Sequence, residues 1–168
     1  TCQVKQGKLI IPAFSLGRTQ EIIFALNKLD FRLKLPDVKI YVDSPLAINA
    51  TNITKNHTSI LNHRVKEFMK FRPDPFGFED VIYVNNKEES QDLNESKEPC
   101  VIISASGMAD AGRVKHHIMH AIEDENNSIL IVGYAELNSL AGKLRSGFKE
   151  VRIYGDMYSV KAEIKIID

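Results

Sequence analysis

The chain has 168 residues, which is the size of one domain. Hydrophobic residues make up 43% of it and charged residues 26%, so a disordered chain is excluded. The 22 basic and 22 acidic residues balance, which excludes a uniformly basic surface but leaves room for a local basic patch. No apolar run approaches the ~20 residues of a membrane span, so no membrane partner is expected. The two cysteines, Cys2 and Cys100, are too few for a disulfide framework and indicate a reducing, cytoplasmic location.

Short β-type runs alternate with amphipathic helical stretches from one end of the chain to the other. Strands are expected at residues 8–13, 38–42, 81–84, 100–104, 128–132, 151–154 and 160–167. Helices are expected near residues 19–29, 46–55, 60–71, 87–94, 112–122 and 140–146. This alternation predicts an α/β domain with a mainly parallel sheet and helices on both faces. Ligands of such domains bind at the carboxyl ends of the strands.

The chain starts at Thr1 and stops directly after the strand-like run at residues 160–167. Because nothing caps that run, we expect the chain to be a segment of a longer protein. Catalytic residues of that protein can then lie outside residues 1–168.

Small and basic residues gather where the predicted strands end. Small residues let backbone amides approach a ligand, and a guanidinium can hold a phosphate through two donors. The candidate phosphate-binding residues are Arg18, Ser44, Ser104, Ser106, Gly107 and Arg113. The alternative is that these are ordinary turn and cap residues, with Arg18 paired to Glu21 or Asp43.

The helical stretch at residues 112–122 carries His116, His117 and His120. His116 and His120 lie one turn apart, as in zinc-binding pairs, but no third ligand is evident nearby. We therefore predict that these histidines cover the helix surface, pack against a neighbouring domain, or contact a polyanion. No nucleophile with a base is recognisable, and Cys100 lies in an apolar strand where it should be inert.

Five blocks of the sequence together resemble a known family. The blocks are residues 11–21, 42–47, 104–113, 132–134 and 160–164. In order and content they resemble the β-CASP region of RNA-processing nucleases with a metallo-β-lactamase fold, including bacterial and archaeal relatives of the pre-mRNA 3′-end cleavage endonuclease. The resemblance implies a Rossmann-like β-CASP domain over residues 1–168, an insert of a larger protein.

The resemblance also implies a function for the longer protein, a zinc-dependent ribonuclease in which two Zn ions activate water for hydrolysis of RNA phosphodiester bonds. The family's His-x-His-x-Asp-His motif lies upstream of this region, and its Ser-x-His motif is expected just after Asp168. No catalytic residue, zinc ligand or cofactor is therefore assigned to this chain, which alone should be inactive. Its expected partners are single-stranded RNA and the metallo-β-lactamase domain, over whose RNA groove it would act as a lid.

One loop departs from the family pattern. Relatives have Glu-Gly-Thr-Leu-Gly where this chain has Leu-Asn-Ser-Leu-Ala at residues 137–141. The loop keeps its length but lacks the two glycines that would let its backbone approach a ligand closely. Two other interpretations stay open: a stand-alone Rossmann-like module that binds a nucleotide or phosphometabolite, and a catalytically silent β-CASP homologue that serves as an assembly partner.

Overall fold

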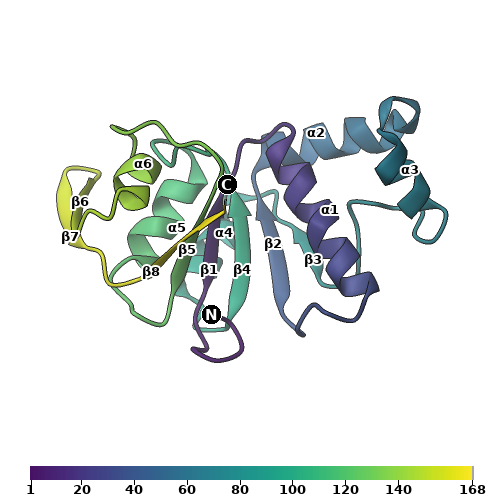
Figure 1. Cartoon of the computed structure of the whole chain (residues 1–168). Helices are drawn as coiled ribbons and strands as arrows, with labels where there is room; N and C mark the ends of the chain where they lie inside the picture. The colour runs from purple at the N-terminus through teal and green to yellow at the C-terminus, as the bar shows by residue number, and fades with distance from the viewer. Residues whose placement is uncertain (168) are drawn as a thin grey trace.

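The computed structural model describes residues 1–167, within which six parallel strands form one sheet and two antiparallel strands form a hairpin (Figure 1). The order of the sheet is β3-β2-β4-β1-β5-β8. Its strands are β1 (Leu9–Pro12), β2 (Lys39–Asp43), β3 (Val81–Tyr83), β4 (Cys100–Ser104), β5 (Ser128–Val132) and β8 (Glu163–Ile167). All neighbouring pairs in this sheet are parallel, so the predicted α/β fold is confirmed.

Each face of the sheet has its own apolar core, because side chains of a strand alternate between the faces. Ile10 and Ile102 lie on one face with α4 (Lys87–Glu95), α5 (Arg113–Ala121) and α6 (Leu140–Arg145). Ile11 and Ile103 lie on the other face with α1 (Arg18–Phe31) and α2 (Pro45–Asn56). Figure 1 shows α1 and α2 on the opposite side of the sheet from α5 and α6.

The predicted helix at residues 60–71 is shorter in the structure. Here α3 spans His63–Met69, because the side chain of Asn62 accepts a hydrogen bond from the Val65 amide and so starts the helix there. A single 3₁₀ turn, η1 (Thr58–Ile60), precedes it. Edge-to-face contacts of Phe68 with Phe24 and Phe31 pack α3 against α1.

The strand predicted at residues 160–167 is shorter in the structure, where β8 begins at Glu163. The strand predicted at residues 151–154 is β6 (Glu150–Ile153), which forms a hairpin with the unpredicted strand β7 (Asp156–Ser159) before the chain enters the sheet as β8. The backbone amides of Lys161 and Ala162 both donate to the carbonyl oxygen of Ile122 at 2.9 Å. These bonds take residues 161 and 162 out of strand pairing and separate β7 from β8.

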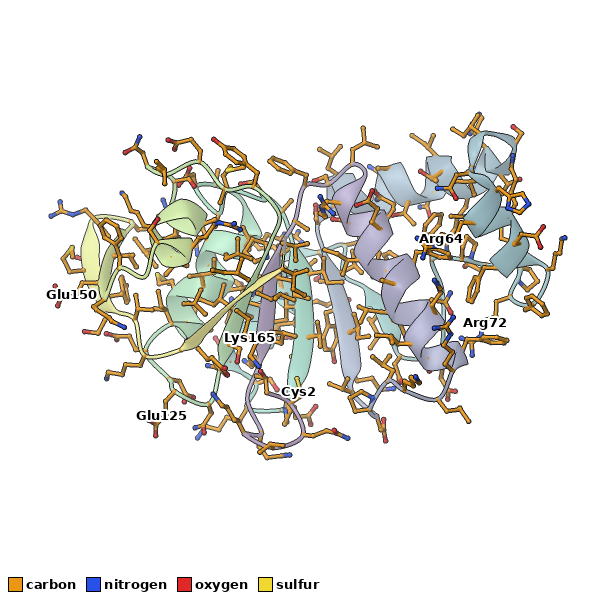
Figure 2. The ribbon with its side chains drawn as sticks, in the orientation of Figure 1. Cys2, Arg64, Arg72, Glu125, Glu150 and Lys165 are labelled. Atoms are coloured by element: carbon orange, nitrogen blue, oxygen red, sulfur yellow. The ribbon has the colours of Figure 1, made fainter. Side chains whose placement is uncertain are left out.

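Both cysteines are free thiols, and within residues 1–167 no helix is long and apolar enough to cross a membrane. Cys2 lies at the amino end of β4, where its Sγ contacts the carbonyl oxygen of Cys100 at 3.4 Å (Figure 2). Cys100 is buried, and burial raises the pKa of its thiol to about 11.

Cys100 should therefore resist alkylation while the chain is folded. In a Cys2→Ser variant at about pH 8, we expect iodoacetamide to react about 100-fold more slowly with Cys100 than after denaturation in urea, because the thiolate is the reacting species. Mass spectrometry of timed samples measures the rate. Equal rates in folded and denatured chain would show that Cys100 is accessible and ionised.

Candidate functional site

The carboxyl ends of β1, β2, β4 and β5 meet at one edge of the sheet, where the segments after β1, β2 and β4 line an open hollow of about 460 Å³. Ser44, Ser106, Gly112 and Arg113 line it, together with the buried Asp43. We call it the rim hollow. It brings together three of the six predicted phosphate-binding residues: Ser44, Ser106 and Arg113.

Asp43, the last residue of β2, is the centre of a buried polar network behind the rim hollow. Its side chain is fully buried. Its Oδ1 accepts a hydrogen bond from Arg113 Nη1 at 2.5 Å, and its Oδ2 accepts from Ser90 Oγ at 2.5 Å and from His117 Nε2 at 2.7 Å. Its backbone oxygen accepts from Ser104 Oγ at 2.6 Å. The carboxylate thus joins β2 to α4 and α5, and the backbone oxygen of the same residue joins β2 to β4.

The hydrogen bonds keep Asp43 ionised in spite of its burial. Burial acts to raise the pKa of the carboxyl, but hydrogen bonds from His117, Ser90 and Arg113 outweigh it and hold the pKa below its ordinary value. Arg113 is fixed from both sides, since Nη2 also donates to the carbonyl oxygen of Asn85 at 3.0 Å. The charge of Arg113 is therefore largely balanced by Asp43, and its guanidinium is held in one position at the rim.

The serines of the candidate set differ in their accessibility. Ser44 is the N-cap of α2, where its Oγ accepts from the Ala47 amide and lies 3.3 Å from Ser15 Oγ. Ser104 is only 1% exposed, and its hydroxyl is engaged with Asp43, so it supports the network beneath the rim hollow. Ser106 is partly exposed and lines the hollow.

Two glycines shape the loop after β4. Gly112 has a φ of 81°, and a Cβ atom at this position would collide with the carbonyl oxygen of Ala105. Gly107 lies under the half-exposed ring of Phe14, where an added Cβ would come within 2.9 Å of Phe14 Cδ2. Gly107 therefore lets the Phe14 ring approach the backbone of this loop closely.

Arg18 does not line the rim hollow; it reaches from the start of α1 toward the end of β5. Its Nη1 pairs with Glu21 Oε2 at 2.8 Å, so Glu21 rather than Asp43 is its partner. A Cβ added at Gly133 would lie 3.3 Å from Arg18 Nη2, and Arg145 Nη1 donates to the Gly133 carbonyl oxygen at 2.9 Å. Two guanidinium groups thus flank Gly133. Arg145 is not recognisable as a site residue from the sequence, because its position at the end of α6 gives no local sign of this contact.

The prediction that all three histidines lie on the helix surface is wrong for His117, which is 1% exposed. Its two ring nitrogens lie 2.7 Å from Asp43 Oδ2 and 2.7 Å from Asn94 Oδ1. The apolar spacing of Val114, Ile118 and Ala121 could have revealed this burial, since residue 117 falls on the same helix face. Within residues 1–167 no three His, Cys, Asp or Glu side chains converge to hold a metal ion.

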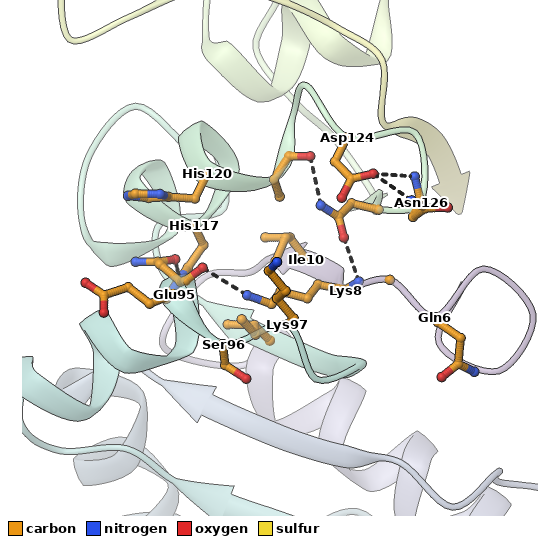
Figure 3. Close-up of a pocket in the computed structure, with 15 residues that line it drawn as sticks. Gln6, Lys8, Ile10, Glu95, Ser96, Lys97, His117, His120, Asp124 and Asn126 are labelled. Carbon is orange, nitrogen blue, oxygen red and sulfur yellow. Dashed lines mark hydrogen bonds between the residues drawn. The ribbon is translucent and has the colours of Figure 1, made fainter.

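A second hollow, also of about 460 Å³, lies at the opposite edge of the sheet, near the start of β1 (Figure 3). Lys8 projects into it, and its Nζ donates to the carbonyl oxygens of Leu93 and Asn94 at 2.6 and 3.1 Å. The backbone amide of Lys8 donates to Asn127 Oδ1 at 2.7 Å. Lys8 therefore caps the end of α4, and these contacts are structural rather than part of a ligand site.

Comparison with known proteins agrees with this architecture. The sequence profile of the Beta-Casp domain matches residues 19–144. The chain is 33% identical over 162 residues to an RNase J-like protein of Methanocaldococcus jannaschii, and 30% identical over 158 residues to Ribonuclease TTHA0252 of Thermus thermophilus. It is also 30% identical over 169 residues to Transcription termination factor FttA of Methanosarcina mazei.

These alignments include 94–96% of the chain but only 36%, 36% and 26% of the three relatives, in the same order. The chain thus corresponds to about a third or a quarter of each of them. Since the Beta-Casp profile covers most of a chain that has the expected α/β fold, the chain belongs to the β-CASP family of nuclease-associated domains.

Proposed function

We propose that the chain is the RNA-binding lid of a zinc-dependent ribonuclease that hydrolyses RNA phosphodiester bonds. The observation that carries this proposal is the position of the rim hollow and of the two arginines at Gly133, which all lie at the carboxyl edge of the parallel sheet. Guanidinium groups, small side chains and partly exposed aromatic rings suit a strand of phosphates and bases. The names of two relatives, RNase J-like protein and Ribonuclease TTHA0252, support a nuclease as the longer protein.

The same edge has apolar side chains that are suited to contact with another domain. Leu16, Leu46, Tyr134 and Leu137 are each at least 68% exposed, and each belongs to a segment that follows a strand of the sheet. Exposed apolar groups clustered at one edge are typical of an interaction surface. We propose that the metallo-β-lactamase domain of the same longer chain faces this edge, so that RNA lies between the two domains.

The described residues do not fit the two zinc ions expected for such an enzyme, because no three ligand-type side chains converge among them. We therefore assign metal-activated water to the other domain and no catalytic step to this chain. Its residues bind the strand, orient it and exclude water. We place the protein in the cytoplasm, where its two free thiols would stay reduced.

RNA binding by the 168-residue chain tests this proposal. Fluorescence anisotropy with a single-stranded oligoribonucleotide of about ten nucleotides should show binding that weakens steeply with salt, as phosphate contacts require. Arg18→Ala should weaken binding by about tenfold, the effect of losing one charged hydrogen bond to phosphate. Gel analysis of the same samples should show intact RNA with added Zn²⁺ or Mn²⁺.

Arg64→Ala is the matched control, since Arg64 is an exposed arginine on α3 (Figure 2). It should leave RNA affinity unchanged. The proposal fails if no RNA is bound, if Arg64→Ala weakens binding as much as Arg18→Ala, or if the chain cleaves RNA and Arg18→Ala abolishes that cleavage. Equal affinity for a mononucleotide and the oligonucleotide would instead favour a nucleotide-binding module.

A further inference from the structure

A hollow of about 430 Å³ lies between α4, α5 and the turn of the β6–β7 hairpin. Lys87 lines it from α4, His116 and His120 from α5, and Tyr154 from the hairpin turn. We call it the α5 hollow. None of the candidate phosphate-binding residues except Arg113 belongs to it.

The α5 hollow is lined by basic side chains and, among the described residues, by no carboxylate, although the chain as a whole has no net charge. Helix α4 carries four acidic residues, but the residues that it turns toward the hollow are Lys87, Ser90, Gln91 and Asn94. Helix α5 contains no acidic residue. Among residues 1–167 no carboxylate pairs with Lys87, His116 or His120. The fold thus gathers basic groups here and directs the acidic groups of α4 elsewhere.

The electrostatics at His116 agree with this description. Burial lowers the pKa of His116, and the neighbouring His117, His120, Lys87 and Lys115 lower it further. The basic neighbours of His116 disfavour a further positive charge on its ring and favour an anion beside it.

An aromatic pair forms one wall of the hollow. The ring centroids of His116 and Tyr154 are 4.8 Å apart, and Lys115 Nζ lies 4.6 Å from the Tyr154 centroid. Tyr154 and Gly155 both have positive φ values, so a tight turn holds this half-exposed ring against α5. Aromatic rings beside basic groups are the combination on which single-stranded nucleic acids stack.

The α5 hollow adjoins the rim hollow. Gly112 and Arg113 line both of them, from the N-terminal end of α5. A strand that extends from the rim hollow into the α5 hollow would cross Gly112, which carries no side chain, and would then reach Lys87 and Tyr154.

We propose that the α5 hollow is an auxiliary subsite that binds a phosphate and base of single-stranded RNA whose neighbouring nucleotides occupy the rim hollow. Lys87 and Lys115 attract the phosphates, and the His116–Tyr154 pair stacks with a base. This subsite rests on the proposed RNA-binding function, and it extends the strand's path from the sheet edge along the side of α5.

The gain in affinity on lengthening the RNA tests the subsite. For the wild-type 168-residue chain, an oligouridylate of about ten nucleotides should bind much more tightly than one of about four, because the longer strand spans both hollows. Lys87→Met and Tyr154→Asn should each reduce this gain by about fivefold to tenfold, with Asn chosen because it tolerates the positive φ at residue 154. Lys87→Met should also lower the slope of log affinity against log salt by about 0.7, the value for one phosphate contact.

Lys34→Met, at an exposed lysine beyond α1, is the matched control and should leave the gain unchanged. Thermal melting monitored by circular dichroism confirms that each variant is folded. An unchanged gain in both Lys87→Met and Tyr154→Asn, together with about tenfold weaker binding in Arg18→Ala, overturns the subsite and leaves the proposed function standing. No binding of either RNA by the wild-type chain overturns both.

Discussion

Replacing Asp43 by asparagine is expected to lower the free energy of unfolding by about 3 kcal/mol, as when one partner of a buried ion pair is removed. The carboxylate is fully buried and accepts hydrogen bonds from Arg113, Ser90 and His117. An amide at this position loses the charge and turns an N–H group toward donors. Urea denaturation followed by circular dichroism measures the change.

Asp30→Asn is the control for Asp43→Asn. Asp30 pairs with Arg72 at 2.5 Å, but both side chains are about 30% exposed. Loss of this ion pair should therefore lower the free energy of unfolding by less than about 1 kcal/mol. Equal effects of the two substitutions would contradict a special role for the Asp43 network.

The Asp43 network also predicts how stability depends on pH. The pKa of Asp43 is lowered in the folded chain, so its contribution is complete above the pKa of the unfolded carboxyl and is lost as the pH falls through the folded pKa. The difference in unfolding free energy between the wild-type chain and Asp43→Asn should therefore shrink below about pH 4. A difference that grows on acidification would contradict the lowered pKa.

Gly112→Ala is the second substitution with a large expected effect. Its φ of 81° is unfavourable for alanine, and the new Cβ would collide with the carbonyl oxygen of Ala105. Strain and collision together should destabilise the chain by about 2–4 kcal/mol. RNA affinity should also fall, because relief of the collision moves the loop that carries Ser106.

Gly147→Ala separates the two causes. Gly147 has the same φ of 81°, but no atom of the described residues lies within 4 Å of a Cβ added there. The Gly147→Ala variant should have a free energy of unfolding about 1 kcal/mol lower than the wild-type chain, from backbone strain alone, and should bind RNA with unchanged affinity. Equal destabilisation by the two substitutions would show that contact with Ala105 is unimportant.

The strands that form the sheet were predictable because each is a short apolar run between turn residues. The predicted bounds of β4 and β5 agree with the structure. The strand β7 was missed because Asp156–Ser159 has no apolar alternation. Its pairing with β6 depends on the tight turn at residues 154 and 155.

The candidate site was predictable only in part, for a related reason. A strand end can be recognised locally, so the sequence predicts that Ser44, Ser106 and Arg113 lie at one edge of the sheet. The buried network could not be recognised, since Asp43 meets Ser90, Arg113 and His117 across 47 to 74 residues of sequence. Those contacts determine that Ser104 is structural and that Arg113 is held by a carboxylate.

Mapping where RNA touches the chain tests the central claim most directly. Amide chemical shifts of the isotope-labelled chain should change, on addition of single-stranded RNA, in the loops after β1, β2, β4 and β5, and along the start of α5. Shifts around Lys8 and Asn127, at the opposite edge of the sheet, should stay constant. Changes confined to that opposite edge would contradict the account, since they would place RNA away from every residue assigned to its binding.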